Sequence, residues 1–498
     1  MQWGSGITYL AETRVKGVAT RFGVKDVDRA AHLALIGKRG SGRADFLANM
    51  ALQDAARGAG VLILDGIGNL AQRFLERVPV EARERLVIID PSDGEHPYSW
   101  NPLDDFRTLP PTEAHEHLVD TLSDMYQAPS GPLLSHIAAE MLNRKDASLL
   151  LAYDIVDPKT RESALPQDAD ARHALEDALT HDAATAAIAE HGRYIARDVL
   201  MRNILGQVSS KFTFARLVEG GIVIMDFSRI RMYPTRMQPL VRLFVNVARV
   251  YEHAHVPVAV YLEDVLRYLD ADSFGRALLE GGIAFAVADT AYGEETAPLR
   301  EGLLHRAGSV FTFAPAAADL GLVGRVFYPY VGQDDLERLE GGQLAVTLAI
   351  DSVRSRPFFA KVLPLPERSG ISTLDLALES REKFTISRLA ADKLFRPKPT
   401  DAEKKDGDPG SFSNAFRSIF ANRAGGAAAG TDAASGAPKA SPAAPAKAPQ
   451  KTAARAAAAP AAHPVAPVKK QKPADIPEKE LKAMVKVKKR PGRKKKIT

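Results

Sequence analysis

The residues with the clearest chemical potential form a short glycine-rich run between an apolar stretch and a segment of helical pattern. The run reads Gly37-Lys38-Arg39-Gly40-Ser41-Gly42-Arg43-Ala44. A strand, a glycine-rich turn and a helix in this order predict a phosphate cradle made of backbone N–H groups and the helix N-terminus. The spacing is that of the phosphate-binding motif G-x4-G-K-[S/T], whose lysine reaches the β- and γ-phosphates and whose hydroxyl holds magnesium.

Both functional side chains of that motif are replaced in this chain. Arg43 stands in the lysine position and carries its charge on a bulkier, planar group, and Ala44 has no oxygen for a metal. Asp45 adds a carboxylate to the first helical turn, where it interacts with the helix dipole but repels a triphosphate. We therefore expect weak binding of Mg·ATP, and we assign no cofactor and no metal ligand. Two alternatives stay open: an ordinary glycine-rich turn, and a rescue in which Lys38 supplies the missing ammonium group.

A second candidate for catalysis is the acidic pair Glu263-Asp264, which follows the apolar stretch Val258–Leu262. Hydrolysis of a nucleotide held in such a cradle needs a buried strand that ends in acids, one to orient metal-bound water and one to polarise the attacking water. The usual order is aspartate before glutamate, and here it is inverted. Because such roles depend on geometry at the ångström level, we predict a degenerate, inactive pair. The alternative is two acids at a strand end without a catalytic role.

Positioning these residues requires strands that end at one edge of a sheet, and the chain has suitable apolar runs. They are Leu33–Ile36, Val61–Leu64, Leu86–Ile89, Ile222–Met225, Val258–Leu262, Ile283–Ala288, Val310–Phe313 and Leu344–Ile350. Several are continuous rather than alternating, which is typical of strands buried on both faces. Helical stretches such as Asp45–Arg57 and Met237–His253 lie between them. The alternation predicts an α/β fold with helices on both faces of a sheet.

The chain divides by pattern into four parts. Residues 1–107 and 206–395 carry the alternation of strands and helices. Residues 108–205 are rich in Ala, Leu, His, Asp and Glu and lack a convincing strand, so we predict an all-helical insertion. Residues 396–498 are rich in Ala, Pro and Lys, and we expect a disordered tail. Within it, the apolar residues of Phe412–Phe420 would share one face of a short helix, which either docks on a partner or folds back on the body.

Composition excludes several classes of protein. The 498 residues include no cysteine, which rules out disulfides and thiolate metal sites. No apolar run approaches the roughly 20 residues that cross a bilayer. The segment Met1–Lys16 lacks the basic and apolar pattern of a signal peptide. We therefore expect a cytoplasmic protein without a transmembrane segment.

Charge is divided unevenly along the chain. The net charge is +5, but residues 425–498 hold 17 Lys and Arg against 4 Asp and Glu, while residues 1–424 hold 49 against 57. An acidic body therefore carries a basic tail, and a basic run of this density binds nucleic acid by releasing counterions, without reading sequence. The residues that we expect to bind DNA are Lys486, Lys488, Lys489, Arg490, Arg493, Lys494, Lys495 and Lys496. The alternative is a tail that improves solubility or binds a protein partner.

The order of these pieces resembles the HerA–FtsK superfamily of P-loop motors, and within it the TraD/TraG-like coupling ATPases of type IV secretion and conjugation. The resemblance covers about residues 5–365. Its landmarks follow the family's order and are His32 before the glycine-rich run, Asp65-Gly66-Ile67-Gly68-Asn69-Leu70, Asp90-Pro91-Ser92-Asp93, Asn101-Pro102-Leu103, the helical insertion, Val260–Glu263 and Arg356-Pro357-Phe358. The family implies a RecA-like P-loop NTPase sheet, assembly into a hexameric ring, and DNA as the translocated polymer.

Departures from the family pattern lie where the family does its chemistry. The resemblance places the arginine that reaches a neighbouring subunit's phosphate at about Gly281, and the polar sensor, usually glutamine, at about Thr290. Both positions have changed, as have the lysine, the hydroxyl and the order of the acids. The resemblance therefore implies a pseudo-ATPase that keeps the scaffold.

Three functions are compatible with these patterns. The first is a non-hydrolysing, DNA-associated relative of the coupling motors, which acts as a scaffold or as an inactive subunit in a ring with an active paralogue. The second is an active, ATP-driven DNA translocase in which Lys38 or Arg43 serves the phosphates. The third is an adaptor that recruits secretion substrates through the helical insertion without touching nucleic acid. We favour the first, because Ala44 removes a metal ligand that the backbone cannot replace.

Overall fold

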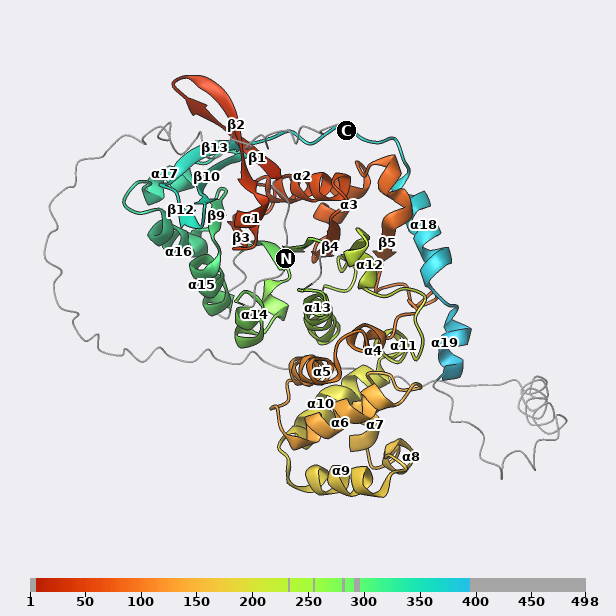
Figure 1. Cartoon of the computed structure of the whole chain (residues 1–498). Helices are drawn as coiled ribbons and strands as arrows, with labels where there is room; N and C mark the ends of the chain where they lie inside the picture. The colour runs from red at the N-terminus through yellow and green to blue at the C-terminus, as the bar shows by residue number, and fades with distance from the viewer. Residues whose placement is uncertain (1–5, 232, 254–255, 280–282, 291–295, 395–498) are drawn as a thin grey trace, which may run out of the picture. The chain divides into compact units, whose positions relative to one another are not determined.

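The fold is built on one large sheet. The structure is a computed structural model that describes residues 6–231, 233–253, 256–279, 283–290 and 296–394 (Figure 1). An 11-stranded sheet runs in the order β2-β1-β13-β10-β9-β3-β8-β7-β4-β6-β5. Its strands are β1 (Ile7–Val15), β2 (Val18–Lys25), β3 (Leu33–Ile36), β4 (Gly60–Asp65), β5 (Leu86–Ile89), β6 (Ile222–Asp226), β7 (Val258–Glu263), β8 (Ile283–Asp289), β9 (Ser309–Thr312), β10 (Gln343–Thr347) and β13 (Phe358–Val362). The predicted α/β fold is confirmed.

The strands that carry the candidate site are parallel and in register. β9, β3, β8, β7, β4, β6 and β5 all run in one direction, while β10, β13, β1 and β2 extend the sheet by antiparallel pairing. Ile36 at the end of β3 is level with Asp289 and with Thr312. Asp65 at the end of β4 is level with Glu263. The residues that follow these strands therefore meet at one carboxyl edge, where ligands of open α/β sheets bind.

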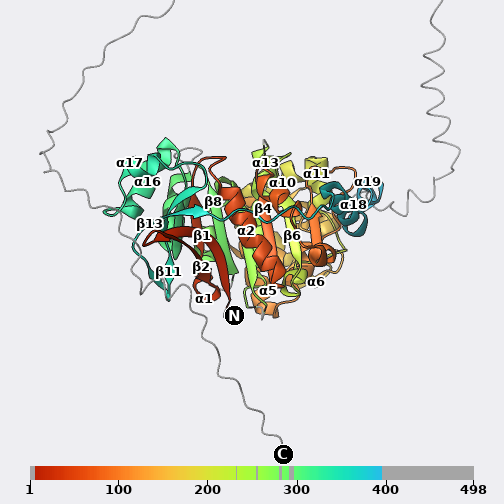
Figure 2. The ribbon, with the colours of Figure 1, turned by 90° about the horizontal axis from the view of Figure 1, so that it is seen from above.

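Helices cover both faces of the sheet. Outside the segment between β5 and β6 they are α1 (Asp26–Arg29), α2 (Arg43–Ala56), α3 (Asn69–Leu75), α13 (Pro234–Arg249), α14 (Ala271–Ala277), α15 (Ala297–Arg306), α16 (Ala317–Phe327), α17 (Gln333–Glu337), α18 (Thr373–Phe384) and α19 (Arg388–Leu394), with short 3-10 turns η1 (Val80–Arg85) and η2 (Leu266–Tyr268). Figure 1 shows α2 and α3 on one side of the sheet and α13 on the other. In Figure 2, α2 crosses the part of the sheet that contains β4 and β8, both of which it contacts.

Two hydrophobic cores follow from this layering. Leu33 and Leu35 of β3 belong to the core shared with α2 and α3. Ala34 and Ile36, one residue out of phase, belong to the core shared with α13 and with helices between β5 and β6. Because each strand residue faces one core or the other, the strands carry the continuous apolar runs seen in the sequence.

The segment between β5 and β6 is helical. Its helices are α4 (Pro102–Phe106), α5 (Pro111–Tyr126), α6 (Pro132–Asn143), α7 (Leu151–Val156), α8 (Arg161–Ala164), α9 (Ala169–His181), α10 (Ala184–Arg197), α11 (Val199–Leu205) and α12 (Ala215–Val218). Apolar residues of α5 and α6 pack in the same core as α13. No helix in the described part of the chain is long and apolar enough to span a bilayer. The tail that begins at residue 396, including Phe412–Phe420, lies outside the described residues.

One predicted strand is wrong in its extent. The apolar run Leu344–Ile350 forms two strands, because β10 ends at Thr347 and β11 (Ala349–Ile350) pairs with β12 (Val353–Arg354). Leu348 separates them: its N–H donates to Oγ of Ser355 at 3.0 Å, and its carbonyl oxygen accepts from the Ser355 N–H at 2.7 Å. This local pairing turns the chain away from the large sheet, which an apolar run alone does not reveal.

Candidate functional site

The glycine-rich turn joins β3 to α2 at the carboxyl edge of the sheet. Its backbone passes through left-handed conformations that glycine adopts without strain, with φ of +77° at Gly40 and +111° at Gly42. Gly42 also precedes α2 and has no side chain to cap the first N–H groups of the helix. At Gly37, an added Cβ would lie 2.7 Å from Cβ of Phe313. The turn therefore has the compact backbone of a phosphate cradle.

Arg43, in the first turn of α2, points into the protein. Its side chain is 2% exposed, and its Nη2 donates to Oδ1 and Oδ2 of Asp264 at 3.1 and 3.2 Å. Oε1 of Glu263 lies 3.9 Å from an Arg43 guanidinium nitrogen. The position from which the motif's lysine would reach phosphate is therefore committed to an internal ion pair with the acids at the end of β7.

Asp264 is held by side chains from three parts of the site. Besides Arg43, Nε of Arg39 donates to Oδ2 of Asp264 at 3.2 Å. Oγ1 of Thr290 lies 3.2 Å from Oδ1 of Asp264 and 3.2 Å from the carbonyl oxygen of Gly37, so its one proton serves either acceptor. Asp264 has a φ of +52°, a left-handed conformation in which aspartate is enriched. These contacts join the glycine-rich turn to the ends of β7 and β8.

The structure brings together most of the residues that the sequence singled out. Arg39, Arg43, Glu263, Asp264 and Thr290 form one cluster. Lys38 is not part of it, because its side chain is exposed and it does not line the cavity beside Arg43. Gly281 and the eight basic residues of the tail lie outside the described residues.

The pKa of Glu263 is raised to about 8. Burial is the main cause, the charges of Asp65 and Asp264 also raise the pKa, and Arg43 lowers it. Its Oε2 is buried and has no hydrogen-bond partner among the described residues. Asp65, at the end of the neighbouring strand, also has a raised pKa of about 6, chiefly because it is buried. The carboxyl edge thus gathers more acid groups than it has cations to pair, and burial keeps some of them protonated.

Asp289 is a site residue that the sequence analysis missed. It ends β8, is fully buried, and neither of its carboxylate oxygens has a hydrogen-bond partner in the part of the chain that the structure describes. Burial raises its pKa well above the usual range, and the charge of Asp264 adds to that. Its backbone carbonyl accepts from the Gly37 N–H at 3.4 Å, directly beneath the turn. The sequence does contain a signal for Asp289, because it is an acidic residue directly after the apolar run Ile283–Ala288. The sequence analysis instead chose the next residue, Thr290.

A small cavity of about 70 Å³ lies beside the guanidinium of Arg43. Residues that line it include Arg39, Arg43, Ala44, Arg73 and Glu263. Ala44 offers no oxygen there. Within the described residues, no group of three or more His, Asp or Glu side chains is arranged to hold a metal ion.

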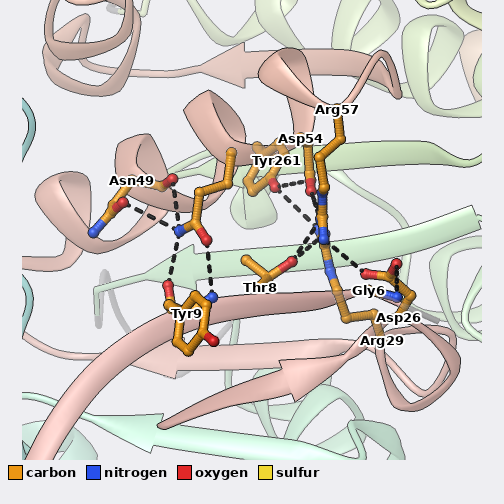
Figure 3. A network of polar contacts seen from close by, with 10 residues as sticks. Gly6, Thr8, Tyr9, Asp26, Arg29, Asn49, Asp54, Arg57 and Tyr261 are labelled. Atoms are coloured by element: carbon orange, nitrogen blue, oxygen red, sulfur yellow. Dashed lines mark hydrogen bonds and ion pairs between the residues drawn. The ribbon is translucent and has the colours of Figure 1, made fainter. Parts of the chain in front are cut away.

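A buried polar network fixes α2 against β7, and so fixes Arg43 against the acids (Figure 3). Arg29 is fully buried; its Nη1 donates to Oδ1 of Asp54 at 2.6 Å and its Nη2 donates to the Tyr261 hydroxyl at 3.0 Å. The Tyr261 hydroxyl donates in turn to Asp54, near the end of α2. Tyr261 lies two residues before Glu263 on β7. Thr8 of β1 accepts from Arg29 at 3.2 Å, which ties the N-terminal hairpin to the same point.

Comparison with known proteins gave a family and several solved structures. The family model for the type IV secretion-system coupling protein DNA-binding domain matches residues 23–184. The bacterial conjugative coupling protein TrwBdeltaN70, in an unbound monoclinic form, is similar at 14% identity and a TM-score of 0.45, over 73% of this chain and 91% of that chain. The plasmid coupling protein TrwB in complex with the ATP analogue ADPNP is 15% identical, with a TM-score of 0.46, over 73% of this chain and 91% of that chain. VirB4 of Thermoanaerobacter pseudethanolicus is 14% identical, with a TM-score of 0.45, over 73% of this chain and 97% of that chain. No curated protein matches.

The family match covers the part of the chain that forms the cradle. Residues 23–184 contain β3, the glycine-rich turn, α2, β4 and β5, and run on into the helical segment as far as the start of α10. The parallel strands and the turn at their carboxyl edge have the arrangement of a P-loop domain. Residues 23–184 of this chain are therefore similar to the DNA-binding domain of type IV secretion-system coupling proteins.

Proposed function

We propose that this protein is a member of a DNA-transfer motor family that does not hydrolyse ATP, and that it acts as a DNA-associated scaffold or as an inactive subunit in a ring with an active paralogue. The observation that carries the proposal is the ion pair between Arg43 and Asp264 inside the cradle. The cation that would meet phosphate and one of the two acids that would serve hydrolysis are bound to each other.

Four features of the site do not fit Mg·ATP. Ala44 cannot ligate the metal, and Asp264 already accepts from Arg39 and Arg43. Burial raises the pKa of Glu263, which makes the ionised form that a divalent cation needs less favourable. The cavity of about 70 Å³ is small beside the ~300–1,000 Å³ of typical small-molecule pockets. Admitting the nucleotide would require breaking a buried ion pair, which costs about 3–5 kcal/mol when one charge loses its partner.

The translocase alternative is not favoured by the geometry. It needs Lys38 or Arg43 to serve the phosphates, but Lys38 is exposed away from the cavity and Arg43 is engaged by Asp264.

Hydrolysis of ATP by the full chain tests the proposal. With magnesium present, we expect phosphate release no faster than in buffer alone, and no change when Glu263 is replaced by glutamine. The exposed Glu337 of α17, which does not line the cavity, provides a matched substitution, Glu337→Gln. Release above background that Glu263→Gln abolishes and Glu337→Gln leaves intact would overturn the proposal.

We further propose that the basic tail supplies the contact with DNA. Its eight clustered cations are Lys486, Lys488, Lys489, Arg490, Arg493, Lys494, Lys495 and Lys496. Each phosphate neutralised releases counterions, so binding should be independent of sequence and should weaken steeply with salt.

A gel-shift series should compare the full chain, a chain that ends at residue 424, and a full chain with those eight positions changed to glutamine. We expect both altered chains to lose most of their affinity for duplex DNA and to show a shallower dependence of log K on log salt. Equal affinity in all three would exclude the tail as the element that binds DNA.

A further inference from the structure

We propose that the outer edge of β2 pairs with an extended, acidic segment of a partner protein. β2 is the terminal strand of the large sheet, and in the part of the chain that the structure describes no strand of that sheet pairs with its outer side. Figure 1 shows the hairpin of β1 and β2, in red, projecting beyond the rest of the sheet. An exposed strand edge presents N–H and C=O groups in the spacing that a further strand requires.

The turn of the hairpin fixes which backbone groups of β2 face outward. Its two central residues, Lys16 and Gly17, both have positive φ, +51° and +84°, which is the type I′ geometry of a two-residue hairpin turn. The residues that flank such a turn bond to each other through the backbone, and bonded and non-bonded pairs then alternate along the strands. Ala19 and Arg21 therefore belong to non-bonded pairs, and their N–H and C=O groups face away from β1.

The opposite edge of the sheet is closed by a helix. Oγ of Ser380, on α18, accepts from the Ile88 N–H of β5 at 2.7 Å and donates to the Ile88 carbonyl oxygen at 3.1 Å. β2 contains no proline, and the register shift of the hairpin lies in β1, between Tyr9 and Ala11. Within the described residues, the outer half of β2 thus lacks a covering helix, a proline and a bulge of its own, which are devices that blunt strand edges. What remains there is charge.

The charge of the hairpin selects an acidic partner. Residues 7–25 contain four Lys and Arg and one acid, whereas residues 1–424 as a whole carry more acids than cations. Arg14 and Arg21 are exposed, and the one acid of the hairpin, Glu12, lies opposite Arg21. Pairing between two copies of this chain would bring like charges together and is therefore disfavoured.

An extended peptide uses both features of this edge. Arg14 lies opposite Ala19, and Glu12 lies opposite Arg21, so the side chains of Arg14 and Arg21 share one face of the hairpin. Acidic side chains at alternate positions of an added strand lie on that same face, while its backbone pairs with the outward groups of β2. Nucleic acid would meet the charge alone, because it has no backbone that pairs with a strand edge.

Binding of labelled peptides, measured by fluorescence anisotropy at low salt, tests this inference. The protein is the full chain with the eight basic residues of the tail changed to glutamine (the tail-neutral chain), so that the tail does not hold the peptide. A peptide of alternating glutamate and valine should bind, and its counterpart with lysine in place of glutamate should not. The glutamate peptide with alternate backbone N–H groups methylated keeps its charge but cannot pair, so it should also fail to bind.

Changes in the hairpin separate backbone pairing from charge. Ala19→Pro removes an outward N–H and should weaken binding of the glutamate peptide by more than about tenfold. Arg14→Gln combined with Arg21→Gln removes two exposed charges and should weaken it by about fivefold. Arg325→Gln, at an exposed ion pair on α16, is the matched control and should bind as the parent does. Urea unfolding of each variant checks that the fold is kept.

Amide hydrogen exchange gives a readout that charge alone would not move. The N–H groups of Ala19 and Arg21 should exchange more slowly when the glutamate peptide is bound to the tail-neutral chain, because both become donors to the added strand. This measurement does not depend on how the variants fold. Unchanged exchange at both amides, or equal binding of the methylated or the lysine peptide, would overturn the inference.

Duplex DNA is the competing ligand. If the glutamate peptide does not bind, and Arg14→Gln with Arg21→Gln weakens DNA binding by the tail-neutral chain, the hairpin contacts nucleic acid and the inference is wrong. None of these results bears on ATP hydrolysis, so the proposed function is tested separately.

Discussion

Replacing Asp264 by asparagine is expected to lower the free energy of unfolding by about 3 kcal/mol, because it leaves the buried guanidinium of Arg43 without its partner. Asparagine adopts the left-handed backbone of this position at least as readily as aspartate, so the loss reports charge rather than strain. The effect should lie at the low end of the range for buried ion pairs. Glu263, 3.9 Å from Arg43, can lose its proton and take over part of the interaction.

A double-mutant cycle isolates the ion pair. Arg43→Met and Asp264→Asn are each expected to destabilise the protein in urea unfolding, and the double variant should be more stable than the sum of the two losses predicts. A coupling free energy of about 1–3 kcal/mol is expected for side chains in direct contact. If the stability losses of the two single variants simply add, Arg43 and Asp264 do not stabilise each other, and the ion pair does not explain the loss of Mg·ATP binding.

Replacing Arg29 by methionine should have a comparable or larger effect, about 3–5 kcal/mol, because Asp54 then remains buried with its main partner gone. Both side chains are fully buried, and Arg29 holds the pKa of Asp54 low against the effect of burial. Arg57 also contacts Asp54, at 2.6 Å, and limits the loss.

Urea unfolding of Arg29→Met, of Arg29→Met with Asp54→Leu, and of Arg83→Gln would check this expectation. The double variant should recover much of the loss, since a buried ion pair is often replaced by apolar side chains at little cost. Arg83→Gln removes an ion pair at the surface, where solvent screens the charges, and should change stability far less than Arg29→Met. If Arg29→Met is as mild as Arg83→Gln, the network in Figure 3 does not fix α2 against β7.

Much of the sheet could be predicted from the sequence because its strands are buried on both faces. Runs such as Val61–Leu64 and Val258–Leu262 are apolar at every position, and they form the interior of β4 and β7. The glycine-rich turn was also recognisable, because glycines at fixed spacing between a strand and a helix mark a backbone conformation rather than a side-chain contact. These signals are local in sequence.

The N-terminal hairpin escaped prediction for a physical reason. The register of β1 against β2 shifts between Tyr9 and Ala11, so the buried positions of β1 change phase within the strand. A period-2 pattern broken in this way does not stand out in a short run.

The chemistry of the site depended on contacts distant in sequence. Two features bring Arg43 to Asp264. One is the parallel register of β4, β7 and β8, and the other is the hydrogen bond between Tyr261 of β7 and Asp54 of α2. Sequence reasoning identified both residues as departures from a motif, but it treated them separately. Asp289 was missed because its environment is defined by Gly37 and Asp264, which lie on other strands and loops.

We propose that an internal ion pair stands in place of Mg·ATP in this cradle, and a titration of the full chain with ATP, in magnesium and in EDTA, tests this proposal. We expect magnesium not to tighten ATP binding, because Ala44 offers the metal no oxygen and Asp264 is engaged by Arg43. Magnesium-dependent binding more than about tenfold tighter than binding in EDTA, lost in Asp264→Asn, would contradict it.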